Sequence, residues 1–384
     1  MSKSKIEIIN CHSHLFTLKH VPDRFLPFGL SRILDHIIFQ KQVLWLLRLL
    51  SFGHTKSLLA RYANFLEIGG KDTQEEVYKV LNSYYPKNTR YIVLPMDMAW
   101  MEAGKPPVSL EEQHKELAEL ALKEKGLLLP FIAVDPRRQR IGGQSLTKMV
   151  EELLDYKHDD GITVFKGIKL YPPLGYLPDD PALSELWHLC EEKSLPLMTH
   201  CSKGGIKSRA LSWDTAASYA DPDHFIPVLR KHPNLRLCLA HMGGQTDWQR
   251  YFQAPSSRRP APLDAPAHER AHMNWLSKIM QMIESQQFPN LYTDISYTVF
   301  YIRQNMPSLK IFLLNDVLRS KTLFGSDFYM SERETFEERY LSMKLRSELG
   351  EKTYRQIACQ NPLDYLGLQG EAECKNTAGQ KPAA

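Results

Sequence analysis

Residues 6–14 read IEIINCHSH, an apolar run that leads directly into two histidines separated by one residue. The apolar run predicts a buried β-strand over Ile6–Ile9. Side chains two residues apart in a strand project on the same side, so His12 and His14 should point together from its carboxyl end. That arrangement suits two nitrogen ligands of one divalent metal ion. By the same alternation, Cys11 should face away and pack between strand and helix.

Strand-like runs recur along the chain, and polar stretches compatible with helices separate them. The eight runs are Ile6–Ile9, Tyr91–Pro95, Leu127–Val134, Thr163–Leu170, Leu195–Thr199, Leu235–Ala240, Leu291–Ile295 and Thr322–Phe324. The helical stretches include Ser109–Lys125, Ser145–Tyr156, Ala182–Lys193, Pro222–Lys231, Met273–Gln286 and Ser308–Leu318. Alternation of strand and helix is typical of a parallel sheet with helical crossovers. Eight units are the number of a TIM (β/α)8 barrel, whereas a doubly wound sheet usually has about five or six strands. We therefore expect an α/β fold of the TIM-barrel class, built as one domain over residues 1–368.

The chain is longer than such a barrel needs, because its 384 residues exceed the roughly 250 that a TIM barrel commonly uses. We assign the surplus to a helical insert after the first strand (15–73), a proline-rich loop after the sixth strand (243–272) and a flexible tail (369–384). In a barrel, the insert and the loop leave from the carboxyl ends of strands, where substrates bind. They are therefore expected to form walls or lids of the site.

The composition is typical of a soluble, folded protein, with 43% apolar and 24% charged residues. Lys and Arg number 48 against 44 Asp and Glu, and the net charge of +4 is too small to predict a nucleic-acid surface. Six scattered cysteines form no CxxC pair, and the first residues lack a signal-peptide pattern. Both observations favour a reducing, cytoplasmic location.

The most apolar stretch, residues 30–52, is long enough to raise the question of a membrane span. Its charged residues, which include Arg32, Asp35, Lys41 and Arg48, would be costly in hydrocarbon. Its apolar residues recur at helical spacing. We therefore expect amphipathic helices and no membrane anchor, with the apolar stripe packed on the body of the protein or on a second copy in a homodimer.

Functional side chains also stand at the ends of four further strand-like runs. His200 ends the fifth run, His241 the sixth and Asp327 the eighth. Lys169 ends the fourth, with Tyr171 two residues later on the same side. Each alone has an ordinary structural explanation, such as a helix cap for Asp327. A barrel, however, gathers its strand ends around one axis, and a metal site needs ligands from distant parts of the chain. Together with the two histidines of the first strand, these residues predict a metal centre at the barrel mouth.

Other residues near the strand ends suggest contacts with substrate. The segment after the fifth strand supplies Lys203, Arg209 and Trp213, which are either a clamp for a carboxylate or aromatic group or solvated loop residues. Asp294, at the end of the seventh strand, is expected to orient a metal ligand as a hydrogen-bond acceptor.

One other segment matches a metal-binding pattern. Residues 268–272 read HERAH and match HExxH, which on a helix places two histidines one turn apart for zinc in metalloproteases. Here the motif follows prolines at 260, 262 and 266, and the downstream sequence offers no supported third ligand. We interpret it as a helix start near the barrel mouth, where one histidine could touch substrate, and not as a protease site.

The ordered motifs at the strand ends resemble those of the metal-dependent amidohydrolase superfamily. Within it, they are similar to the amidohydrolase-2 group, which also contains the aminocarboxymuconate-semialdehyde-type decarboxylases. The motifs are NCHSH (10–14), FKGIKLYPP (165–173), MTHCS (198–202), LAHMGG (239–244) and LFGSDF (323–328). The resemblance covers the barrel from residue 6 to about residue 366 but not the inserts.

The resemblance implies a role for each strand-end residue. His12 and His14 would be metal ligands from the first strand, and His200 a ligand from the fifth. His241 would be a ligand or a water-polarising base. Asp327 would contact the metal and shuttle a proton.

Lys169 stands where some members of the superfamily carry a carboxylated lysine that bridges two metal ions. Other members have a lysine nearby without that role. The resemblance therefore leaves open whether the site holds one metal ion or two.

Our first hypothesis is a metal-dependent hydrolase that attacks a C–N or C–O bond of amide, lactone or ester type in a small molecule. Zinc with an open position lowers the pKa of its bound water to about 7, and Mn²⁺ or another divalent ion is an alternative. Asp327 would take the proton of this water and return it to the leaving group. The second hypothesis is a non-oxidative decarboxylase on the same scaffold. A third, a metal-binding assembly module without catalysis, is disfavoured because a structural zinc usually has four local ligands.

We predict that the 30–52 stretch buries its apolar stripe in the native protein. Limited proteolysis of the intact chain should therefore cleave this stretch no faster than its other helical segments. Rapid cleavage within 30–52 under native conditions would show that the stretch is not docked.

Overall fold

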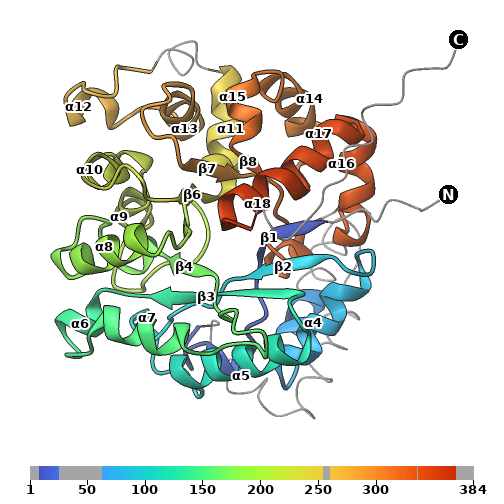
Figure 1. The fold of residues 1–384 in the computed structure, drawn as a ribbon. Helices are drawn as coiled ribbons and strands as arrows, with labels where there is room; N and C mark the ends of the chain where they lie inside the picture. Colours follow the sequence, from blue (N-terminus) through green and yellow to red (C-terminus); the bar gives the residue numbers. More distant parts are fainter. Residues whose placement is uncertain (1–7, 26–62, 254–259, 335, 369–384) are drawn as a thin grey trace, which may run out of the picture.

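The eight predicted strands form one parallel sheet in chain order, and the sheet curls round until its first and last strands meet (Figure 1). The structure is a computed structural model that describes residues 8–25, 63–253, 260–334 and 336–368. The strands are β1 (Ile9–Ser13), β2 (Arg90–Val93), β3 (Leu128–Val134), β4 (Gly167–Leu170), β5 (Leu197–Thr199), β6 (Leu237–Leu239), β7 (Leu291–Asp294) and β8 (Thr322–Leu323). The ring closes where the Cys11 backbone N–H donates to Phe324 O, at 2.9 Å. The predicted TIM-barrel fold is confirmed.

Helices surround this barrel of strands as an outer layer (Figure 1). In the described part of the chain they include α4 (Gln74–Ser83), α5 (Leu110–Lys123), α6 (Arg137–Arg140), α7 (Leu146–Leu154), α8 (Ser184–Glu192), α9 (Trp213–Tyr219), α10 (Ile226–Lys231), α11 (Gln245–Gln253), α12 (Ala267–Arg270), α13 (Trp275–Glu284), α14 (Ile302–Phe312), α15 (Asp316–Ser320), α16 (Leu341–Leu349), α17 (Glu351–Arg355) and α18 (Asn361–Leu366). Local sequence sets several of their starts. Ser109 and Glu112 form a reciprocal capping box that begins α5.

The inside of the barrel is filled by its own apolar cluster. Its members come from alternating strand positions and from the last helices, and are Ile9, Cys11, Ile92, Leu94, Leu129, Phe131, Met198, Cys238, Ala240, Tyr292, Leu323, Cys359, Leu363, Tyr365 and Leu366. Helix α18 closes the end of the barrel opposite the carboxyl ends of the strands, because Tyr365 Oη donates to Leu197 O at the start of β5, at 2.7 Å. The barrel is therefore a packed core with a functional site at one end only.

A β-bulge interrupts the regular alternation of β1. Asn10 pairs with Tyr91 and Ser13 with Val93, so β1 fits one more residue than β2 between the same two points. The Asn10 side chain fixes this shape by bonding across the closure of the ring. Its Oδ1 accepts from Ser326 N at 3.1 Å, and its Nδ2 donates to Ser326 Oγ at 2.8 Å.

The bulge corrects two sequence-based expectations. In the described residues the first strand spans Ile9–Ser13, so His12 lies within the strand and not after it; residues 6 and 7 lie outside the described part. Cys11 belongs to the cluster inside the barrel, and the prediction that it packs between strand and helix is wrong. The extra residue turns both Cys11 and His12 inward, which strict alternation forbids. Cys201, next to His200, lies in the outer cluster instead.

The surplus segments are only partly described. The apolar stretch 30–52 and the tail 369–384 lie outside the described residues. The prediction of a continuous loop over 243–272 is wrong, because α11 occupies its first part. Trp248, Tyr251 and Phe252 recur at helical spacing and pack their rings on Phe312, and the prolines come only after this helix.

The helix expected over Ser308–Leu318 is also divided. Helix α14 ends at Phe312, and α15 begins at Asp316. The Asn315 side chain accepts from the backbone N–H groups of Val317 and Leu318 and so starts a second helix.

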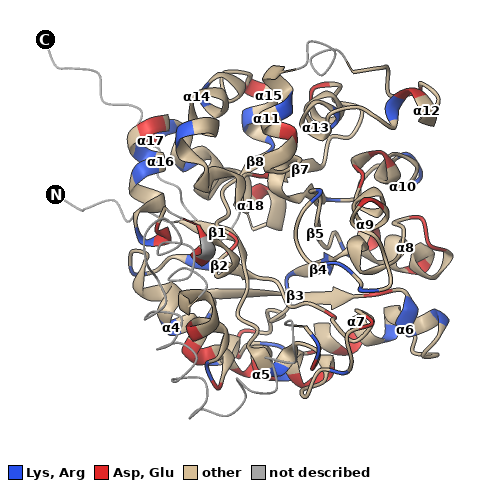
Figure 2. Cartoon of the chain, turned by 180° about the vertical axis from the view of Figure 1, so that it is seen from behind, with Lys and Arg blue, Asp and Glu red and all other residues tan. Residues whose placement is uncertain are grey.

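No helix in the described part of the chain is long and apolar enough to cross a membrane. Acidic and basic side chains occur together on outer helices such as α5 and α16 (Figure 2). This mixture agrees with the small net charge of +4.

We predict that Tyr365→Ala lowers the free energy of unfolding by about 3–5 kcal/mol, because it removes a buried ring and a hydrogen bond from the barrel floor. Tyr340→Ala is the matched control, since Tyr340 is 48% exposed, and should change stability by less than about 0.5 kcal/mol. Urea denaturation measures both values. Equal losses in the two variants would contradict the assigned role of α18.

Candidate active site

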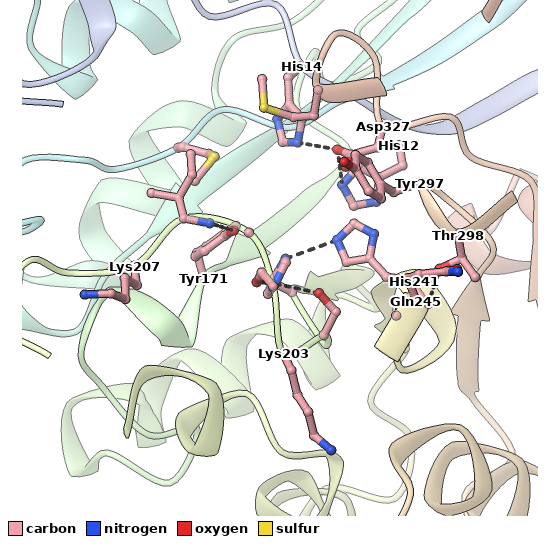
Figure 3. Close-up of a pocket in the computed structure, with 18 of the residues that line it drawn as sticks. His12, His14, Tyr171, Lys203, Lys207, His241, Gln245, Tyr297, Thr298 and Asp327 are labelled. Carbon is pink, nitrogen blue, oxygen red and sulfur yellow. Dashed lines mark hydrogen bonds and ion pairs between the residues drawn. The ribbon is translucent and has the colours of Figure 1, made fainter. Parts of the chain in front are cut away.

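A cavity of about 780 Å³ opens at the carboxyl ends of the strands. Five of the six residues expected to bind metal line it, namely His12, His14, His200, His241 and Asp327. They come from four separate strand ends, and Figure 3 shows the side chains of His12, His14, His241 and Asp327 converging. The barrel closure thus brings together groups that lie up to about 300 residues apart in the sequence.

The first-strand histidines meet the eighth-strand carboxylate. His14 Nε2 lies 3.1 Å from Asp327 Oδ1, and His12 Nε2 lies 3.5 Å from the same oxygen. Burial alone would raise the pKa of Asp327, but the neighbouring imidazoles hold this pKa below its ordinary value. The carboxylate is therefore ionised, and it shares one small volume with two ring nitrogens.

Three of the imidazoles are anchored through the nitrogen that faces away from the cavity. The contacts are His12 Nδ1 to Asp294 Oδ2 at 2.8 Å, His14 Nδ1 to Leu94 O at 2.7 Å, and His200 Nε2 to Gly204 O at 2.8 Å. Carbonyl and carboxylate oxygens only accept hydrogen bonds, so each outer nitrogen carries the proton. Burial keeps the rings of His12 and His200 neutral, so their inner nitrogens, His12 Nε2 and His200 Nδ1, are bare, and His14 Nε2 is directed at Asp327.

His241 faces the same centre. Its Nε2 lies 3.1 Å from His200 Nδ1, and its Nδ1 is directed at Ser296 on β7's carboxyl side. Burial lowers the pKa of His12 to about 3, and burial also lowers the pKa values of His200 and His241. The rings are therefore neutral, which is the form that binds metals.

Asp294 acts as a hydrogen-bond hub between these residues. Besides the ring of His12, it accepts from His241 N at 2.9 Å, from Ser296 N at 3.0 Å and from Ser296 Oγ. His12, His241 and Asp294 lie close enough to suggest a metal site of their own. The oxygens of Asp294 are already occupied by these donors, however, so this group is better explained as an orienting network.

Two site residues have left-handed backbone conformations. His241 has φ 67° and Asp327 has φ 65°, a region that residues other than glycine rarely adopt. Asp327 N donates to His12 O at 2.8 Å, and Thr298 Oγ1 donates to His241 O at 2.8 Å. These bonds hold each strained residue in place. Such strain is common where a backbone must aim a functional side chain.

Lys169 does not line the cavity but lies below it, within the barrel. Its side chain is buried, and its Nζ has no hydrogen-bond partner in the described part of the chain. Burial lowers the pKa of Lys169 to about 8, against the opposing effect of Asp294 and Asp327. The structure thus holds an amine that is easily deprotonated beneath the site.

The expected substrate-binding residues separate into two groups. Tyr171 stacks on His200 with ring centres 4.4 Å apart, and Arg209 and Trp213 also line the cavity. Lys203 contributes to the lining as well, but its Nζ pairs with Asp247 at 3.0 Å and points away from the histidines (Figure 3). Its charge is therefore paired with Asp247, an ion pair that the sequence did not predict.

The sequence predicted that the insert 15–73 would help to form a wall of the site, but it marked no individual residue of the apolar wall and missed one polar residue. The wall includes Phe25, Phe65, Leu66, Met96 and Met101. These residues follow β1 and β2 without a regular pattern, so no sequence signal marked them. Ser296 was also missed, although its place two residues after Asp294 at a strand end was a usable signal.

The HExxH segment forms no metal site. Helix α12 covers only Ala267–Arg270, so the two histidines do not share a formed helix. His268 and His272 are exposed and neither lines the cavity, so the expectation that one could touch substrate is not supported. Arg270 is buried and pairs with Asp223 at 2.7 Å.

We predict that Asp294→Asn lowers the affinity of the protein for divalent metal by about 10- to 100-fold, because it weakens the bond that fixes the His12 ring. Isothermal titration of the metal-free protein with zinc measures this affinity. Asp316→Asn, at an 85% exposed side chain, is the control and should bind zinc as the unaltered protein does. Unchanged affinity in Asp294→Asn would refute the orienting role.

Comparison with solved structures finds the same fold. A 5-carboxyvanillate decarboxylase from Sphingomonas paucimobilis shares 11% identity at a TM-score of 0.51, over 94% of this chain and 99% of the other. An uncharacterised TIM-barrel protein from Bordetella bronchiseptica shares 16% identity at 0.50, over 94% and 99%. A dihydroxybenzoic acid decarboxylase from a Polaromonas species, with bound manganese and an inhibitor, shares 13% identity at 0.50, over 94% and 97%. At these identities the likeness establishes the fold alone.

Sequence comparison gives the family. No curated protein matches the chain significantly. A family model described as amidohydrolase, however, matches residues 100–368, which is well over half of the chain. The match begins after β2 and so omits His12 and His14, which the fold itself brings to the other strand ends. The chain belongs to the amidohydrolase family, in its amidohydrolase-2 group.

Proposed function

We propose that this protein is a metal-dependent hydrolase that cleaves a C–N or C–O bond of amide, lactone or ester type in a small molecule. The observation that carries the proposal is the set of bare ring nitrogens and one ionised carboxylate that converge on a single cavity. The coarser conclusion, an enzyme of the amidohydrolase family that acts through a metal centre, agrees with the family match.

The donor set fits a divalent metal ion. His12 Nε2 and His14 Nε2 both approach Asp327 Oδ1, and His200 Nδ1 faces His241 Nε2 at 3.1 Å. Lone pairs this close repel each other unless a proton or a cation lies between them. Imidazole nitrogen with carboxylate oxygen is a ligand set for zinc, and Mn²⁺, present in the Polaromonas relative, is the alternative.

In the proposed site, His12, His14, His200 and Asp327 hold the ion. A bound divalent metal lowers the pKa of water and polarises a substrate carbonyl. His241 Nε2, bare and directed into the cavity, accepts the proton of an attacking water and later donates it to the leaving nitrogen or oxygen. Asp327 is the second group able to carry this proton, because it lines the same cavity.

Lys169 determines whether one ion or two is held. Carboxylation of its buried amine would create an anionic ligand that bridges a second ion. As an ammonium, the same group would repel a second ion and attract a substrate carboxylate. Elemental analysis of the purified protein distinguishes one metal per chain from two.

The substrate would lie between the metal centre and the apolar wall. Tyr171, Arg209 and Trp213 are the proposed substrate contacts from the described part of the chain. The aromatic rings suit an apolar or aromatic body, and Arg209 suits an anionic group. The volume of about 780 Å³ is that of a small-molecule site.

A second candidate reaction is non-oxidative decarboxylation. The apolar wall of Phe65, Leu66 and Met101 favours it, because loss of CO₂ disperses a carboxylate charge that apolar surroundings destabilise. His241 or Asp327 would then protonate the carbon left behind.

We also propose a cytoplasmic location and a homodimer, with no nucleic-acid or membrane partner. Cys11, Cys190, Cys201 and Cys238 are buried and form no disulfide with one another, which supports a reducing compartment. The dimer rests on the apolar stripe of residues 30–52, which lies outside the described residues.

We predict that His12→Ala and Asp327→Asn each abolish turnover and that His12→Ala also lowers bound metal. The exposed His272 provides the matched control, and His272→Ala should keep full activity and metal content. Elemental analysis and steady-state kinetics measure the effects. Unchanged zinc content in His12→Ala would refute the proposed ligand set.

The reaction type is tested with a panel of esters, lactones, amides and aromatic carboxylic acids in ¹⁸O-labelled water. Hydrolysis by attack of water on the carbonyl carbon places ¹⁸O in the carboxylic acid product, as mass spectrometry detects. Release of CO₂ without ¹⁸O in the organic product would overturn hydrolysis in favour of decarboxylation.

A further inference from the structure

Ser296 occupies a position that the proposed function does not yet use. It is fully buried just after β7, and its hydroxyl lies among three groups. Ser296 Oγ is 2.9 Å from His241 Nδ1 and 3.1 Å from His12 Nδ1, and it donates to Asp294 Oδ1. One hydroxyl thus touches two of the imidazoles and the hub carboxylate.

The direction of these hydrogen bonds follows from counting protons. A serine hydroxyl has one proton, and an ionised carboxylate can only accept. The contact of Ser296 Oγ with Asp294 is the closest of the three, and hydrogen bonds to a charged acceptor are about twice as strong as neutral ones. The hydroxyl proton therefore goes to Asp294, and only the lone pairs of Oγ remain for the imidazoles.

His241 Nδ1 must then be the donor. Besides Ser296 Oγ, it lies 3.3 Å from the backbone oxygen of the same residue, which can only accept. Both contacts need a proton on Nδ1. The opposite ring nitrogen, Nε2, is consequently bare.

We propose that Ser296 is a positioning residue that fixes the proton of His241 on Nδ1 and so makes Nε2 the proton-accepting atom of the site. Its kinetic consequence rests on the proposed hydrolase function, whereas the tautomer itself does not. The competing tautomer has a specific alternative partner, because His241 Nε2–H could donate to the bare His200 Nδ1 at 3.1 Å. Ser296 holds the ring in the first arrangement.

The same chain of bonds stabilises the charged ring during turnover. When Nε2 takes a proton from water, His241 becomes a cation with a proton on each nitrogen. Nδ1–H then donates to Ser296 Oγ, whose own O–H is directed at the negative Asp294. The negative charge of Asp294 therefore stabilises the His241 imidazolium through the hydroxyl of Ser296. The proton returns from Nε2 to the leaving group, and the ring regains its first form.

The direct test is nitrogen NMR of the full-length protein labelled with ¹⁵N-histidine, in metal-free and zinc-loaded forms. The His241 signals are assigned from His241→Asn. In the zinc-loaded unaltered protein, Nδ1 should show the shift of a protonated nitrogen and Nε2 that of a bare one. In zinc-loaded Ser296→Ala, where only the backbone oxygen of residue 296 still accepts from Nδ1, the fraction of His241 protonated on Nδ1 should fall and the two shifts should move toward each other.

Two further variants separate a positioning role from a packing role. Ser296→Cys keeps the side-chain volume with a weaker donor, and should give an intermediate tautomer population. Ser342→Ala removes another buried hydroxyl, on α16 and away from the cavity, and should leave the His241 shifts unchanged. A proton on Nε2 in the unaltered protein, or unchanged shifts in Ser296→Ala, would overturn the proposal.

Kinetics provide the second measurement. Ser296→Ala should lower kcat by about 10- to 100-fold, with KM and zinc content within about twofold of the unaltered protein. A parallel loss of zinc would assign Ser296 to the metal ligands and overturn its proposed action through His241. Should the hydrolase function itself fail, with no turnover of any substrate, the NMR result still decides the tautomer.

Discussion

The carboxylate of Asp294 is the interaction on which the site depends. It is fully buried, and it accepts bonds from the His12 ring, the His241 backbone and the Ser296 hydroxyl. Burial raises the pKa of Asp294, but its interaction with His12 and its other donors holds the pKa below the ordinary value. Burying the charge of Asp294 would be costly without partners, but both of its oxygens accept hydrogen bonds. The carboxylate therefore holds the ends of β1, β6 and β7 in a fixed arrangement.

The hydrogen bonds of Asp294 explain how the site keeps its geometry. Each anchored imidazole gives its proton to an acceptor on the outer side and keeps a lone pair on the inner side. The rings therefore cannot turn without breaking a buried hydrogen bond, which costs about 1–3 kcal/mol when the partner stays unsatisfied. The left-handed backbone at His241 and Asp327 adds a cost that these same bonds offset. The site is thus organised before any ligand arrives, as metal centres require.

The sequence predicted the barrel and the gathering of His12, His200 and Asp327, because strand ends in this fold converge whatever the local detail. It could not predict the bulge in β1, since the extra residue is specified by the Asn10 side chain bonding to Ser326 across the ring. The sequence left open whether Lys203 is a clamp or a solvated loop residue, and it could not show the ion pair with Asp247, because Asp247 lies on a helix that the prolines further along had obscured. Contacts that depend on residues far away in the sequence cannot be predicted from the spacing of apolar residues.

The closure of the ring through Asn10 and Ser326 also constrains how the protein is made. These two side chains are 316 residues apart in sequence, and the apolar floor beneath the site needs Tyr365 as well. Contacts of such long range form late, after the entropy of a very large loop has been overcome. During synthesis, His12 and His14 therefore remain without their partners until β8 and α18 have left the ribosome. A growing chain carries residues of the proposed metal centre near both of its ends, so these residues can come together only as the last step of folding.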